Sequence, residues 1–180
     1  KTNTNIGKSP LFPKYETFAD FLSNTIIGKR KHTISEFFYR TQHIQQLGGY
    51  QIYPAGYYAD DASILLFCNN NGIASTEESL IVYRKSENNI SSSSCWNVEK
   101  SKAALKYYQW IIDEFPMKQQ DEQIIQQRLD FDLYTYFSAA LNIHQSIQIL
   151  NCIPVNIWNW KKKLLCLYKF ILNSYAKQIK

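Results

Sequence analysis

The spacing of apolar residues divides the chain into a mixed first half and a helical second half. From Ala104 onward, apolar side chains recur every three or four positions, which is the period of a helix with one buried face. This pattern predicts a helix that ends at Pro116, a helix or broken pair of helices across 121–150, and a final helix after Pro154.

The final predicted helix has two faces of different character. Its apolar stripe consists of Ile157, Trp160, Leu164, Tyr168, Ile171 and Tyr175. At about 100° per residue, four lysines cluster on the opposite side, namely Lys162, Lys169, Lys177 and Lys180. Two interpretations stay open. The stripe packs on the domain and the lysines face water, or residues 155–180 lie on an anionic membrane surface, which suits Lys combined with Trp and Leu.

The first half carries shorter elements separated by turn residues. Thr17 and Asp20 have the spacing of a capping box and predict a short helix that ends at Gly28. Residues 33–40 and 79–84 are β-branched and aromatic, so both segments are predicted to be strands. Two short strands make only a marginal sheet in water, and they are therefore expected to extend a sheet supplied by upstream sequence.

Two further helices are predicted between these strands. Thr41 can begin one that runs to Leu47, and Gly48 and Gly49 end it as helix-terminating glycines do. A turn at 54–56 then leads to a second helix, which contains Ile64, Leu65 and Cys68 and stops at Asn69–Gly72. The predicted class is α+β and mostly helical.

The composition argues against nucleic-acid binding and in favour of a reducing compartment. The net charge of +5 comes with only two three-residue basic clusters, 29–31 and 161–163. These are expected to be solvated surface rather than a nucleic-acid site. The four cysteines have no CxxC spacing, which favours reduced thiols and a cytoplasmic location. Membrane contact through residues 155–180 would place the protein at the inner face of the membrane. The chain begins at Lys1 and not at Met, so we expect missing upstream sequence.

Three runs follow one another in a family-like order: FFYRTQHIQQLGGY at 37–50, YYADDASILLFCNNNG at 57–72 and LIVYRKSENNIS at 80–91. Together they resemble the second half of bacterial family 2 (GT-A type) glycosyltransferases. The resemblance implies that residues 1–98 are the acceptor-side half of a GT-A-like α/β fold and that 99–180 are a helical extension. It implies cytoplasmic transfer of a single sugar from a nucleotide sugar to a carbohydrate acceptor, in cell-surface polysaccharide synthesis.

The resemblance also assigns site residues. Asp61 falls on the aspartate of the family's acidic motif, which implies the general base that takes the proton of the acceptor hydroxyl. Asp60 is implied to lie near the acceptor. Tyr57 and Tyr58, just before the acids, are candidates to stack on an acceptor sugar, with packing in the core as the alternative. Arg40 and Arg84 are candidates for the phosphate or donor side. Consecutive residues on a helix point about 100° apart, so the two acids are expected to have different roles.

Other family features are missing from the sequence. The chain has no DxD motif in the family's position, because Asp130-Phe131-Asp132 lies in the helical extension. The Mg or Mn ion expected in the full-length enzyme therefore has no predicted ligand here, and this chain alone is expected to be inactive. The alternative function is a non-enzymatic helical module that binds a partner or a membrane surface, in which Asp60 and Asp61 only cap a helix.

Overall fold

The computed structural model describes residues 12–30, 34–69, 71–76 and 93–178, with side chains as far as Leu172. The described chain is mostly helical and contains one two-stranded sheet, which confirms the predicted class. It divides into two compact units: unit 1 is 1–49 and 63–84, and unit 2 is 50–62 and 85–180. Residues 50–62 belong to the same unit as the second-half helices.

The sheet of unit 1 joins segments far apart in the sequence. Strand β1 (Tyr15–Glu16) pairs antiparallel with β2 (Ile73–Ala74), with Glu16 opposite Ile73. Gly72 precedes β2 with φ +67°, and a Cβ there would come within 2.3 Å of the backbone oxygen of Glu16. Position 72 therefore requires glycine both for its backbone angle and for this close approach.

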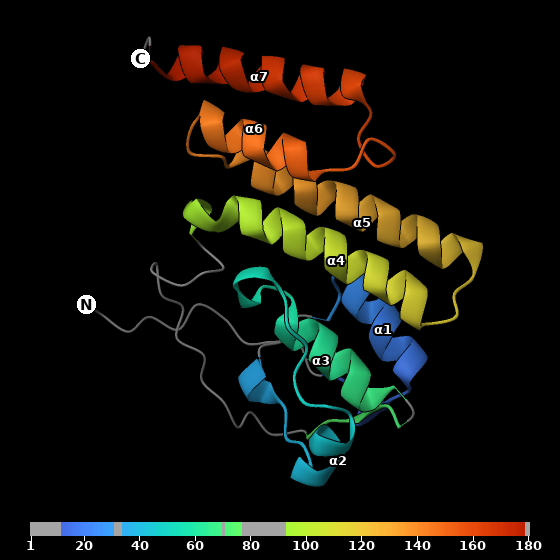
Figure 1. Ribbon diagram of the computed structural model, residues 1–180. Helices are drawn as coiled ribbons and strands as arrows, with labels where there is room; N and C mark the ends of the chain where they lie inside the picture. The colour runs from blue at the N-terminus through green and yellow to red at the C-terminus, as the bar shows by residue number, and fades with distance from the viewer. Residues whose placement is uncertain (1–11, 31–33, 70, 77–92, 179–180) are drawn as a thin grey trace. The chain divides into compact units, whose positions relative to one another are not determined.

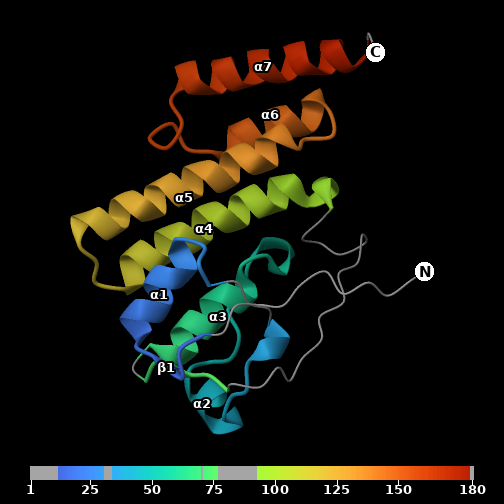
Figure 2. The ribbon, with the colours of Figure 1, turned by 180° about the vertical axis from the view of Figure 1, so that it is seen from behind.

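Helix α1 (Phe18–Ile26) follows β1 directly, as Figure 2 shows. Its predicted N-cap is confirmed, since the Thr17 hydroxyl accepts a hydrogen bond from the amide of Asp20 at 3.2 Å. Beyond the helix, Arg30 is buried and forms an ion pair with buried Glu16. The expectation that the cluster at 29–31 is solvated surface is therefore wrong for Arg30, because a charge can be buried when it has a partner.

The predicted strand at 33–40 is wrong over its described residues. A 3₁₀ turn, η1, covers Ile34–Glu36, and 37–40 has no regular structure. The aromatic residues of this segment instead contact other rings: Phe37 lies 6.4 Å from Phe21, and Tyr39 lies 5.1 Å from Phe67 between ring centroids. Aromatic packing therefore accounts for the composition that suggested a strand. The second predicted strand, 79–84, lies outside the described residues.

Helix α2 (Thr41–Gln46) ends as the sequence predicts. The amide of Gly49 donates to the oxygen of Ile44 at 2.9 Å, and the amide of Gly48 donates to that of Gln45 at 3.2 Å. This pair of bonds is the Schellman motif. Both glycines have positive φ and nothing within 4 Å of an added Cβ, so their role is conformational.

Unit 2 is a stack of helices (Figure 1). It begins with a 3₁₀ turn, η2 (Pro54–Gly56), and with the first turn of α3 (Ala59–Cys68), whose later residues belong to unit 1. A second 3₁₀ turn, η3 (Ser94–Trp96), leads into α4 (Asn97–Glu114). The remaining helices are α5 (Gln119–Ser138), α6 (Ile143–Cys152) and α7 (Trp160–Gln178).

The predicted region 121–150 is a broken pair of helices. Helix α5 ends at Ser138, and Asn142 caps α6 by accepting the amide of Gln145 at 2.9 Å. Trp158, which is fully buried, fixes the loop before α7 through a hydrogen bond from its indole nitrogen to Asp130. Short connections, at 139–142 and 153–159, thus join α5, α6 and α7.

The buried side of α7 is not the one expected from the first interpretation of its sequence. Cys166 is buried, and Phe170 contacts Phe137 of α5 at 5.9 Å between ring centroids. Lys162 is partly buried and bonds to Asp130. Much of the predicted apolar stripe is exposed instead: Trp160, Leu164, Tyr168 and Ile171 all face outward. The prediction that this stripe packs on the domain while Lys162 faces water is therefore wrong.

Candidate functional site

The structure brings four of the predicted site residues together where α3 begins. Tyr57 and Tyr58 follow η2, and Asp60 and Asp61 occupy the first turn of α3. Tyr58 has φ +65°, and its carbonyl accepts the first helical hydrogen bond, from Ala62 at 3.0 Å. A left-handed backbone is rare for a bulky residue and costs about 1 kcal/mol, so surrounding contacts must hold Tyr58 in place.

The carboxylate of Asp60 bonds to the backbone of its neighbour. It accepts the backbone N–H of Asp61 at 3.1 Å, within the first turn of α3. Both side chains are partly buried. The positive end of the helix dipole favours a charged carboxylate at either position.

Aromatic rings pack around this turn. The ring of Tyr58 stacks on Tyr107 of α4, with centroids 4.7 Å apart and planes within 13°. Tyr57 contacts Tyr58 edge to face at 4.9 Å and Tyr136 of α5 at 5.9 Å. One ring face of Tyr58 is thus covered by protein, whereas Tyr57 is held through edge-to-face contacts that leave it partly exposed.

A buried carboxylate organises the polar atoms beneath these rings. Asp132 of α5 accepts the hydroxyl of Tyr58 at 2.9 Å and that of Tyr108 at 2.6 Å. The hydroxyl of Tyr136 lies 2.9 Å from that of Tyr58, and Arg128 lies 3.5 Å from Asp132, one helical turn away. We call Tyr58, Tyr108, Arg128, Asp132 and Tyr136 the Asp132 network. It explains how the strained backbone of Tyr58 is held.

Burial keeps the tyrosines of this region protonated. It raises the pKa of Tyr53 to about 12 and is the main cause of the raised pKa values of Tyr57, Tyr58 and Tyr107. The negative charges of Asp60 and Asp61 add to the effect on Tyr57 and Tyr107. At neutral pH these phenols are therefore hydrogen-bond donors and not bases.

Sequence reasoning missed Asp132. It considered Asp130 and Asp132 only as a possible DxD motif, yet the two side chains are about 200° apart on the helix. Asp130 bonds to Trp158 and Lys162, and Asp132 bonds to the tyrosines. The i, i+4 spacing of Arg128 and Asp132 was the local signal; the partners Tyr58 and Tyr108 have no local signal.

Of the two predicted donor-side arginines, the structure describes one, Arg40. Arg40 is an exposed residue at the start of α2 in unit 1, and its side chain makes no capping bond. Arg84 lies outside the described residues. Among the residues that the structure describes, no group of three His, Cys, Asp or Glu side chains is placed to hold a metal ion.

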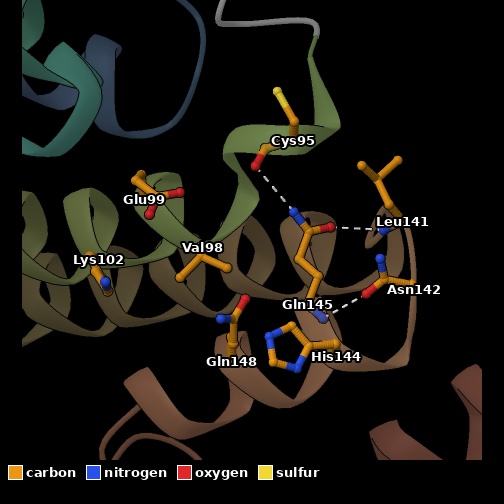
Figure 3. Close-up of a pocket in the computed structure, with 9 residues that line it drawn as sticks. All are labelled: Cys95, Val98, Glu99, Lys102, Leu141, Asn142, His144, Gln145 and Gln148. Atoms are coloured by element: carbon orange, nitrogen blue, oxygen red, sulfur yellow. Dashed lines mark hydrogen bonds between the residues drawn. The ribbon is translucent and has the colours of Figure 1, made fainter.

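An open hollow of about 380 Å³ lies elsewhere in unit 2, between the starts of α4 and α6 (Figure 3). Gln145 lines it and makes three hydrogen bonds. Its side-chain nitrogen donates to the backbone oxygens of Ser94 and Cys95, and its side-chain oxygen accepts the backbone N–H of Leu141. These bonds join η3 to α6. The hollow therefore has a structural explanation, and Asp60 and Asp61 do not line it.

Comparison of the chain with known protein families, with curated proteins and with solved structures gives no match. Within the described residues, no helix combines the length and apolar character needed to cross a bilayer.

Proposed function

We propose that this chain is the acceptor-side half of an inverting GT-A-type glycosyltransferase that transfers a single sugar from a nucleotide sugar to a carbohydrate acceptor. Asp61 is the general base of this proposal. Asp60 fixes the helix start beside it, and Tyr57 offers its ring to the acceptor sugar. Tyr58 belongs to the same acceptor side but is also anchored to Asp132.

One observation carries the proposal: two acids whose order in the sequence resembles the family motif lie in one helical turn, next to a rigid group of tyrosines. A base must be held within hydrogen-bond reach of the acceptor hydroxyl. The anchored tyrosines and the bond from Asp60 to the amide of Asp61 supply such rigidity. Positioning of this kind lowers a reaction barrier by several kcal/mol.

The Mg or Mn ion expected for the complete enzyme is given no ligand from this half. Its described residues include no group of three His, Cys, Asp or Glu side chains placed to hold an ion. In this reaction Asp61 accepts the proton of the acceptor hydroxyl, whose oxygen bonds to the anomeric carbon as the nucleoside diphosphate leaves. Arg40 and Arg84 stay candidates for the phosphate side.

The test is substitution of Asp61 in the full-length protein that contains this half. Release of nucleoside diphosphate from a panel of nucleotide sugars is measured with and without acceptor oligosaccharides. Asp61→Asn should lower kcat by about 10²- to 10⁴-fold, the usual contribution of a general base, while donor binding is unchanged.

The matched control is Asp113→Asn, which alters an exposed acid on α4 that accepts a hydrogen bond from the side-chain amide of Gln109. It should leave kcat unchanged. Urea unfolding of each variant separates loss of rate from loss of folding. Normal turnover by Asp61→Asn, or loss of activity only in proportion to loss of folded protein, would remove the base from the proposal.

A further inference from the structure

The side of α7 that points away from α6 is apolar. Six of its residues form this surface, which we call the outer face of α7: Trp160, Leu164, Leu165, Tyr168, Ile171 and Leu172. Trp160, Leu164 and Tyr168 retain 61%, 56% and 60% of their accessible surface. In Figures 1 and 2, α6 lies on one side of α7, and none of the other described helices of unit 2 lies on the opposite side. A continuous exposed apolar surface of this kind marks an interaction site.

The charged residues of α7 are all lysines. All fifteen acidic residues of the chain precede Leu133, whereas six lysines follow it. The remaining fourteen basic residues nearly balance the fifteen acids, so the positive charge of the protein resides in its last 48 residues. Lys161 and Lys169 are exposed on α7, and the amine of Lys161 lies 5.7 Å from the centre of the Trp160 ring.

We infer that the outer face of α7 docks on an anionic lipid bilayer, with the helix lying in the plane of the interface. Leucine and isoleucine would enter the boundary of the acyl chains, Trp160 and Tyr168 would lie at headgroup depth, and the lysines would meet lipid phosphates. A second copy of the chain fits this surface less well. A two-fold contact would bring the lysines of both copies together with no acid on either helix to offset them. The inference is independent of the proposed catalytic function.

The experiment is co-sedimentation of the 180-residue protein with vesicles. One set is made of phosphatidylcholine alone and the other of phosphatidylcholine and phosphatidylglycerol in equal parts. The protein should sediment with the mixed vesicles and much less with the neutral ones, and added salt should weaken binding. Lys161→Gln and Lys169→Gln should each weaken binding to the mixed vesicles about fivefold.

The apolar contribution is tested by the double variant Leu164→Ser, Tyr168→Ser, which should weaken binding on the order of a hundredfold. Its matched control is Ile52→Ser, Tyr50→Ser, which removes an exposed aliphatic and an exposed tyrosine elsewhere in unit 2. The control should bind as the original protein does. Circular dichroism confirms that each variant is folded.

Three outcomes overturn the inference. In the first, neither kind of vesicle retains the protein. In the second, the control variant loses as much binding as the α7 variant. In the third, sedimentation equilibrium shows a dimer that only the α7 variant dissociates and that mixed vesicles do not displace. That result would assign the face to a second copy of the chain.

Discussion

Unit 2 contains two regions rich in aromatic residues, one largely buried and one exposed. The Asp132 network buries tyrosines against a carboxylate, and its hydroxyls bond to Asp132 or to one another. The outer face of α7 exposes Trp160 and Tyr168 among leucines and isoleucine. Both lie on helices with aromatic residues at helical spacing, so spacing alone does not distinguish them.

The two regions differ in whether a carboxylate lies next to the aromatic side chains. Asp132 gives buried phenols an acceptor, which offsets the cost of removing them from water. Helix α7 contains no acid. On the side that packs against α5, Lys162 forms an ion pair with Asp130. The remaining apolar surface of α7 has no such partner within the described helices of unit 2. Three changes test this contrast.

Alkaline pH should have the largest effect, and it should act through the buried tyrosines. The unfolded chain releases phenolic protons near pH 10, and burial raises the folded pKa values of Tyr53, Tyr58 and Tyr108 above this. The unfolded state therefore binds fewer protons above pH 10, and stability that is complete below pH 10 is lost as pH rises. Each such tyrosine should cost about 1 kcal/mol at about pH 11. Urea unfolding at about pH 9 and about pH 11 measures the loss, and equal midpoints would contradict it.

Asp132→Ala should have the next largest effect. It leaves the hydroxyls of Tyr58 and Tyr108 buried without their acceptor, which should lower the free energy of unfolding by about 3 kcal/mol. Urea denaturation measures the change. Tyr108→Phe removes one donor only and should cost about 1 kcal/mol.

The control for the Asp132 network is Tyr134→Phe, because Tyr134 is on the same helix but exposed. It should change stability by less than about 0.5 kcal/mol. If Asp132→Ala were as stable as this control, the network would not be what holds the turn before α3.

The double variant Leu164→Ser, Tyr168→Ser should have the smallest effect on stability. Exposed side chains contribute little to folding, so each change should alter the free energy of unfolding by about 0.5 kcal/mol or less. Thermal unfolding in the absence of lipid measures this. A loss of several kcal/mol would show that the outer face of α7 is covered in the folded protein.

Local signals predicted several elements well. The bonds at Thr17 and at Gly48 and Gly49 involve neighbours within five residues, so their sequence pattern was sufficient. The stop of α3 at Cys68 depends likewise on local turn residues. The strand predicted at 33–40 failed because its composition serves ring contacts with Phe21 and Phe67. β-Propensity reports packing rather than backbone preference.

For the candidate site, the sequence by itself determined that Tyr57, Tyr58, Asp60 and Asp61 adjoin a helix start, because they are consecutive or nearly so. It also determined that α7 would have an apolar stripe and lysines. Only the tertiary structure decided that Asp132, 74 residues from Tyr58, anchors that tyrosine, and that the α7 stripe points outward. The physical reason is that helical periodicity defines faces of a helix, while the partner each face meets depends on how distant segments pack.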